Sequence, residues 1–184
     1  INVDKHPFIG GIVISVSMGM FLTLPISSAA IGIMLGLSGL ASGAATIGCC
    51  CQMVGFAVMS FKENKVGGLI SQGIGTSMLQ MPNIIRHPQI WIPPILSSAI
   101  LAPVSTMVFK MVSNPVGSGM GTSGLVGQFS AYAVMVGAGT HPATAVIQIM
   151  VMHFVLPALV TYVIAYGMRK AGWIKDVYMK LDVQ

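Results

Sequence analysis

The sequence predicts an all-α, polytopic integral membrane protein, chiefly from the distribution of its charges. Only 7% of the 184 residues are charged, against roughly 25% in a typical soluble domain. The mean hydropathy is +0.85, and the stretches 6–61 and 111–168 hold no Asp, Glu, Lys or Arg. A helix crosses the hydrocarbon with ~20 mainly apolar residues, so each stretch must cross it more than once. A soluble fold would leave this surface in water almost without charge to solvate it.

The apolar segments divide the chain into expected elements. Residues 8–24, 90–112 and 143–168 each have the composition of a spanning helix. The prolines within 90–112 are acceptable, because neighbouring helices or water satisfy the carbonyls that proline frees. Residues 26–61 are too long for one helix and barely enough for two, so we expect a spanning helix plus a broken or half helix.

Two uncharged stretches, 66–85 and 113–142, are rich in Gly, Ser, Thr and amides. This composition does not favour a regular spanning helix. They carry a repeat, since Gly73-Ile-Gly-Thr-Ser77 recurs as Gly119-Met-Gly-Thr-Ser123. Each copy is followed by a glutamine (Gln80, Gln128) and then by His-Pro (His87-Pro88, His141-Pro142). Internal duplication of this kind is typical of secondary transporters. We therefore expect two re-entrant or broken-helix hairpins related as an inverted repeat.

The basic residues punctuate the apolar runs, as the positive-inside bias predicts, and do not form a patch for nucleic acid. The densest group, Arg169, Lys170, Lys175 and Lys180, follows the last span. We place this C-terminal tail and the loop 62–65 in the cytoplasm. The first hairpin then enters from the cytoplasm and the second from outside, so that the two Gly-x-Gly-Thr-Ser turns approach the midplane from opposite faces.

Irregular backbone at membrane depth is tolerated where it is buried or lines an aqueous cavity, which suggests a substrate site at these turns. The backbone amides at Gly75 and Gly121 belong to it. The predicted substrate-binding side chains are Thr76, Ser77, Gln80 and Asn83 in the first hairpin, and Thr122, Ser123, Gln128 and His141 in the second. No catalytic residue, cofactor or metal is expected.

Other conspicuous residues have a packing interpretation. Three successive cysteines, Cys49, Cys50 and Cys51, cannot converge on one metal ion from a helix, because neighbouring side chains point ~100° apart. The glycines of 32–48 have small-xxx-small spacing, which favours close helix contacts. His153, in the middle of a span, should face the bundle interior, as a hydrogen-bonded packing residue or as a substrate contact. All four acids lie outside the apolar runs, which argues against ion-coupled transport.

Several segments resemble a known bacterial family. They are residues 24–40 with 48–57 (Gly48-Cys-Cys-Cys-Gln-Met-Val-Gly-Phe-Ala57), 75–83 (Gly75-Thr-Ser-Met-Leu-Gln-Met-Pro-Asn83) and 119–128 (Gly119-Met-Gly-Thr-Ser-Gly-Leu-Val-Gly-Gln128). The chain is similar to the membrane (IIC) components of the phosphotransferase system, a group that includes the perfringolysin regulator-like proteins. The similarity runs from about His6 to Trp173 and corresponds to the C-terminal half of such proteins. Residues 1–184 would then be one transmembrane domain and a fragment of a longer chain.

The resemblance implies a carbohydrate-type permease in the bacterial plasma membrane, frequently a homodimer. Soluble partner components would carry the phosphoryl group, so any phosphotransferase activity would need separate domains. The Gly-Ile-Thr-Glu-type motif and membrane glutamate of well-studied sugar permeases are absent here. Two alternatives to a permease of a small polar solute therefore remain: a membrane sensor or regulator of gene expression without transport, and a passive channel.

Overall fold

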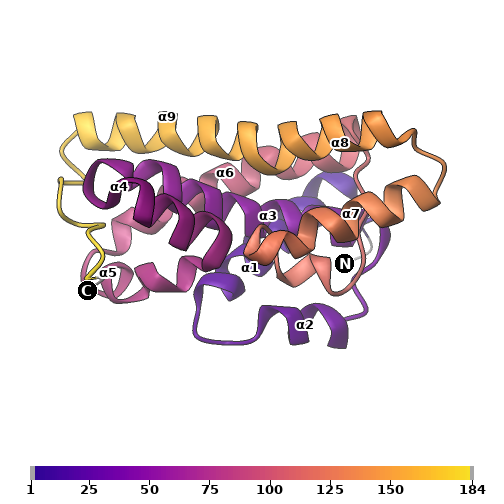
Figure 1. Ribbon diagram of the computed structural model, residues 1–184, viewed down its shortest axis with the longest axis horizontal. Coiled ribbons are helices and arrows are strands. Elements are labelled where there is room, and N and C mark those ends of the chain that lie inside the picture. The colour runs from indigo at the N-terminus through magenta and orange to yellow at the C-terminus, as the bar shows by residue number, and fades with distance from the viewer. Residues whose placement is uncertain (1–2, 183–184) are drawn as a thin grey trace.

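The computed structural model describes residues 3–182, and all the regular secondary structure within that range is helical (Figure 1). The α-helices are α1 (Pro7–Thr23), α2 (Ser28–Met34), α3 (Gly39–Met59), α4 (Phe61–Ile70), α5 (Met81–Arg86), α6 (Ile92–Pro103), α7 (Val126–Gly137), α8 (Pro142–Met150) and α9 (Leu156–Lys170). Shorter π and 3-10 segments are η1 (Ser71–Gly75), η2 (Ser77–Gln80), η3 (Pro88–Trp91), η4 (Val104–Val108), η5 (Gly117–Gly119), η6 (Ser123–Leu125) and η7 (Val151–Val155). The all-α prediction is confirmed.

Three helical stretches in the described residues are long and apolar enough to cross a membrane. They are Gly39–Met59, Pro88–Val108 and Pro142–Lys170. The last two correspond to the predicted segments 90–112 and 143–168. The first, together with the two-turn helix α2, matches the division of 26–61 into a spanning helix and a half helix.

Helix α3 is the centre of the molecule, with α1, α6 and α9 packed around it. Every residue from Ser42 to Ala57 is buried. Small residues permit this, because a Cβ on Gly48 would lie 1.8 Å from the Ser15 carbonyl oxygen of α1. A Cβ on Gly43 would lie 2.0 Å from the Met111 carbonyl oxygen. Helices in lipid rely on such close backbone contact, since there is no hydrophobic drive between them.

The small-residue interpretation of 32–48 is wrong at two glycines. Gly36 and Gly39 have φ of +60° and +58° and nothing within 4 Å of a would-be Cβ. They lie where α2 ends and α3 begins, so their role is the left-handed backbone that glycine adopts without strain. Gly32 does pack, against Ser118 and Pro115.

Helix α1 and helix α2 form a hairpin that the sequence did not predict. The last residue of α1, Thr23, hydrogen-bonds Gln52 of α3, two turns before α3 ends at Met59. At 17 residues, α1 is a shorter apolar helix than the three spans. After the turn at 24–27 the chain runs back as α2, whose Ser28 donates to the carbonyl of Gly119.

The two predicted hairpins are present, and their limbs differ in secondary structure. The first consists of α4 and η1 leading in and η2 and α5 leading out, with extended Thr76 between them. It begins at Phe61, earlier than the predicted residue 66. In the second, the inward limb between η4 and α7 holds only the 3-10 turns η5 and η6, and the outward limb is α7.

The spans that follow the two repeat copies run in opposite directions. Ile90, at the start of the Pro88–Val108 span, packs with Ala165, near the end of the last span. Leu101, near the other end, packs with Ile149 and Met152 at the beginning of the last span. Both spans start at the proline of a His-Pro pair. The two copies are therefore inverted relative to one another.

Candidate functional site

The two Gly-x-Gly-Thr-Ser turns contact each other directly. The hydroxyl of Thr122, in the second copy, donates a hydrogen bond to the carbonyl oxygen of Gly73 in the first. The neighbouring Ser123 hydroxyl donates to the Gly75 carbonyl oxygen at 3.0 Å. Side chains of one copy thus satisfy backbone carbonyls of the other, which the π turn of η1 leaves without a regular helical partner.

The turns meet beside the middle of α3. A Cβ on Gly121 would lie 2.6 Å from the Cβ of Cys49, and the φ of Gly121 is +53°. Glycine is required there for both space and conformation. The first turn passes Ala57, whose Cβ lies 3.4 Å from a would-be Cβ on Gly73. The first hairpin reaches this point from the Met59 end of α3 and the second from the Gly39 end, where Met111 packs on Gly43.

A buried polar cluster adjoins the first turn. Thr23 lies 2.9 Å from the Ser77 hydroxyl and donates to Gln52 Oε1 at 3.1 Å. Trp91 Nε1 donates to the same Gln52 oxygen at 2.9 Å. These residues come from four elements: α1, α3, η2 and η3. Thr23, Gln52 and Ser77 have no exposed surface, and Trp91 is half-buried.

The Gln52 amide nitrogen has no hydrogen-bond partner among the described residues. Leaving a buried donor unsatisfied costs about 1–3 kcal/mol. Its two N–H groups would be satisfied by the oxygens of a bound hydroxylated molecule or by water. The cluster thus offers an unpaired donor, together with hydroxyls that both donate and accept.

Sequence reasoning missed Thr23, Gln52 and Trp91. One signal was present, because Gln52 is the only amide residue in the uncharged run 6–61. An amide inside a span is costly unless it has partners or a function. Thr23 and Trp91 carried no comparable signal, since their proximity to Gln52 depends on tertiary packing.

Two predicted residues, Gln80 and Asn83, lie farther along the first hairpin, and Thr76 lies in the turn itself. Gln80 bonds Gln72 Oε1 at 2.8 Å and the Met179 carbonyl at 3.0 Å. Asn83 bonds Gln80 and the Lys180 carbonyl, each at 2.9 Å. The two side chains therefore attach the C-terminal tail to the first hairpin. Thr76 is half-buried and accepts from the amide of Met78, two residues on.

Of the remaining two predicted residues, Gln128 adjoins the second turn, because the amide of its neighbour Gly127 donates to the Gly121 carbonyl at 2.9 Å. Gln128, in α7, lies 2.9 Å from Nδ1 of His153 in η7, and both side chains are buried. His153 faces the bundle interior, as predicted. His141 is exposed at the start of α8, where its ring nitrogen accepts from the Ala143 amide.

The three cysteines contact different neighbours. Cys49 donates to the carbonyls of Met18 and Ser118, Cys50 approaches Gln128, and Cys51 accepts from Ser97. All are fully buried thiols, which agrees with a packing role. Within residues 3–182, no group of three or more His, Cys, Asp or Glu side chains is placed to hold a metal ion.

Comparison with known proteins places the chain in a family. Residues 2–181 match the family model described as Phosphotransferase system, EIIC. The chain belongs to the EIIC family. No curated protein and no solved structure matches it. Membership and the apolar helices together make this EIIC chain a bacterial membrane protein of a transport system.

Proposed function

We propose that this EIIC chain is a permease component that binds a small carbohydrate where the two repeat turns meet and passes it across the membrane. The observation that carries the proposal is the contact itself, in which inverted Gly-rich turns from opposite ends of α3 touch near a buried amide whose nitrogen has no partner. Inverted repeats with broken helices at the midplane are the usual architecture of a transport site.

The chemistry of the contact suits a carbohydrate. Each sugar hydroxyl can donate one hydrogen bond and accept two, so it matches amides and hydroxyls better than charges. The proposed contacts are Gln52 Nε2 with Thr76, Ser77, Thr122, Ser123 and the backbone at Gly121. Separating Thr122 and Ser123 from the carbonyls of Gly73 and Gly75 would open the contact and expose four polar groups to the solute.

Gln80, Asn83, Gln128 and His141 stay predicted solute contacts on the two sides of this point. Gln80 and Asn83 lie toward the C-terminal tail, while His141 lies at the opposite end of the last span. We further propose that soluble phosphotransferase components phosphorylate the solute and that the protein works as a homodimer, both of which rest on family membership.

The test compares two threonine substitutions in the full chain. Thr122→Val removes the hydroxyl that bonds Gly73 while keeping the shape of the side chain. Thr144→Val makes the same change at an exposed position of α8. Uptake of a panel of labelled sugars is measured in cells that supply the soluble phosphotransferase components and lack other sugar permeases.

We expect uptake of one sugar class by the parent chain and by Thr144→Val, with uptake reduced about tenfold in Thr122→Val, the cost of roughly one buried hydrogen bond. Equal amounts of each protein in the membrane are the necessary control. No flux for any sugar, with altered transcription when the chain is deleted, would instead establish the sensor alternative.

A further inference from the structure

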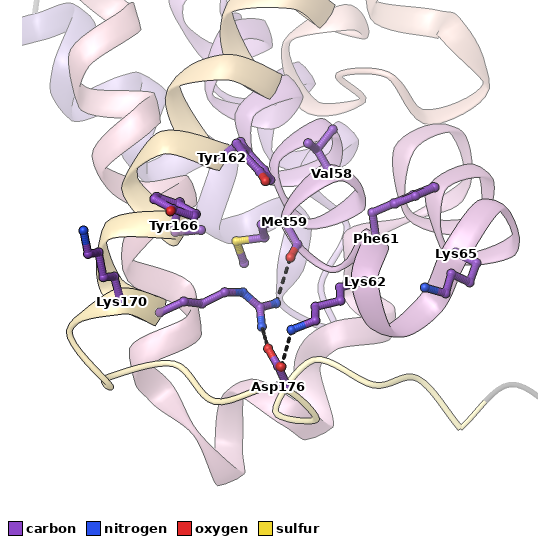
Figure 2. A pocket seen from close by; sticks show the side chains of 11 residues that line it. Val58, Met59, Phe61, Lys62, Lys65, Tyr162, Tyr166, Lys170 and Asp176 are labelled. Atoms are coloured by element: carbon purple, nitrogen blue, oxygen red, sulfur yellow. Dashed lines mark hydrogen bonds and ion pairs between the residues drawn. The ribbon is translucent and has the colours of Figure 1, made fainter.

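A cavity of about 700 Å³ opens away from the repeat turns, between the end of α3, the start of α4 and the end of α9 (Figure 2). Four basic side chains line it: Lys62, Lys65, Arg169 and Lys170. Asp176 is the carboxylate in the lining, so the lining carries a net charge of +3. We call this cavity the basic pocket.

The charges of the basic pocket are only partly neutralised by the protein. Asp176 bonds both Lys62 and Arg169, and Arg169 also bonds Glu63 at 2.7 Å. No ion pair within residues 3–182 involves Lys65 or Lys170, which lie on opposite sides of the cavity in Figure 2. Each of these two lysines has no counter-charge within the described residues and would attract an anion that enters the cavity.

The wall formed by α9 is aromatic and continues into an apolar surface. Tyr162 and Tyr166 line the pocket with their rings stacked at 6.4 Å and are more than half exposed. Leu159 and Val163, 57% and 66% exposed, extend the same surface along the helix. Tyrosine at a membrane–water interface places its ring in the apolar layer and its hydroxyl in the polar one.

We propose that the basic pocket binds an anionic phospholipid, with phosphates at Lys65 and at Lys170 and an acyl chain along Tyr162 and Leu159. A basic cavity alone would suit any phosphate. The exposed apolar surface leading out of it favours a phosphate that carries a hydrocarbon chain. A lipid with two phosphates matches the two lysines that have no ion pair better than a lipid with a single phosphate.

The experiment measures lipid binding by the full chain purified in a neutral detergent. Retained lipids are counted by native mass spectrometry, and the thermal midpoint is recorded with added diphosphatidylglycerol, phosphatidylglycerol or phosphatidylcholine. The pocket variant is Lys65→Gln with Lys170→Gln. The control is Lys175→Gln with Lys180→Gln, which removes the same charge from exposed positions of the tail that do not line the pocket.

We expect the parent and the control to retain anionic lipid and to be stabilised most by diphosphatidylglycerol. The pocket variant, which lacks two basic residues, should retain roughly 25-fold less, since each basic residue near an anionic headgroup contributes on the order of fivefold. Equal losses in the two variants, or equal stabilisation by phosphatidylcholine, would overturn the proposal. If inorganic pyrophosphate without lipid stabilised the protein as much as the lipid does, the pocket would be a site for a soluble phosphate. That result would also overturn the lipid proposal.

Discussion

At the scale of single residues, Gln52 is a fully buried amide in the middle of the central helix. Its oxygen accepts from Trp91 and Thr23, whereas its nitrogen is buried without a partner. The bonds from Trp91 and Thr23 account for the oxygen, whereas the buried nitrogen has a desolvation cost that no bond within the described residues offsets. The amide is therefore expected to serve solute binding.

Replacing this amide should separate binding from folding. Gln52→Met keeps the length of the side chain and removes both polar atoms. We expect sugar uptake to fall at least about tenfold, the equivalent of roughly 1.4 kcal/mol, while membrane levels and the thermal midpoint change little. The matched control is Gln148→Met, at a half-buried position of α8. Unchanged uptake with a lowered midpoint would show that Gln52 is structural.

The sequence predicted some of these residues and missed others for a physical reason. Thr122 and Ser123 were recognisable because a repeat marks both copies of the motif. That they donate to Gly73 and Gly75 could not be predicted, since the repeat is symmetric in sequence and its hydrogen bonds are not. In the first copy, the equivalent Ser77 bonds Thr23 instead. Partners across a fold depend on packing, which one sequence does not encode locally.

At the scale of elements, the sequence predicted the two hairpins but not how far each helix reaches along the bundle. The predicted end of the first helix at residue 24 agrees with α1, which ends at Thr23. The contact between Thr23 and Gln52 shows that α1 ends two turns before α3 does. Hydropathy cannot detect this, because a helix of 17 apolar residues nearly spans the hydrocarbon by length alone. The irregular inward limb of the second hairpin was likewise indicated only by its glycines.

The contact between α1 and α3 should tolerate no added atom. A Cβ at Gly48 would lie 1.8 Å from the backbone oxygen of Ser15, so Gly48→Ala must push the helices apart. We expect destabilisation of about 1–3 kcal/mol or more, typical of overpacking. At Gly167 of α9, a Cβ meets nothing within 4 Å. Gly167→Ala should therefore leave stability unchanged or raise it by up to ~1 kcal/mol.

Thermal midpoints of the two alanine variants in detergent, read by size-exclusion chromatography after heating, provide the measurement. The clash argument predicts a clear ordering, with Gly48→Ala below the parent and Gly167→Ala at or above it. Equal midpoints for both would mean that α1 moves away from α3 at no cost, contrary to the packing described above.

The C-terminal tail should be released by acid. The hydrogen bond from Lys62, together with the charges of Lys62 and Arg169, holds the pKa of Asp176 below its ordinary value. The stabilisation from this pairing is therefore complete above the ordinary pKa and is lost as the pH falls through the lower, folded value. Because the carboxylate is exposed and solvent-screened, the effect should be local.

Hydrogen exchange of residues 171–182, corrected for intrinsic rates and followed from about pH 7 to about pH 3, tests this linkage. Protection should drop below about pH 4. Asp176→Asn should show the unprotected tail already at neutral pH, whereas Asp182→Asn, an exposed acid near the end of the tail, should not. A tail equally protected at both extremes of pH would show that Gln80 and Asn83 hold it without help from Asp176.

At the scale of the whole molecule, the fold collects most of its basic residues at one end. The bond from Arg169 to the Met59 carbonyl joins the end of α9 to the end of α3, next to Lys62 and Lys65. Arg86 lies at the same end, because its neighbour His87 stacks on Tyr178 of the tail. Lys110 lies at the opposite end, since the adjacent Met111 packs on Gly43. Such asymmetry predicts a cytoplasmic location for the basic end.

The orientation can be measured with single introduced cysteines, because Cys49, Cys50 and Cys51 are fully buried and should not react with a membrane-impermeant thiol reagent. Lys175→Cys reports the basic end and Ala138→Cys the opposite one, both at exposed positions. We expect labelling of Ala138→Cys in intact cells and of Lys175→Cys only after permeabilisation. The reverse result would move the basic pocket to the outer leaflet and make the first hairpin, not the second, the one that faces the arriving solute. Orientation therefore decides which repeat turn meets the solute first, even though the contact between the turns stays the same.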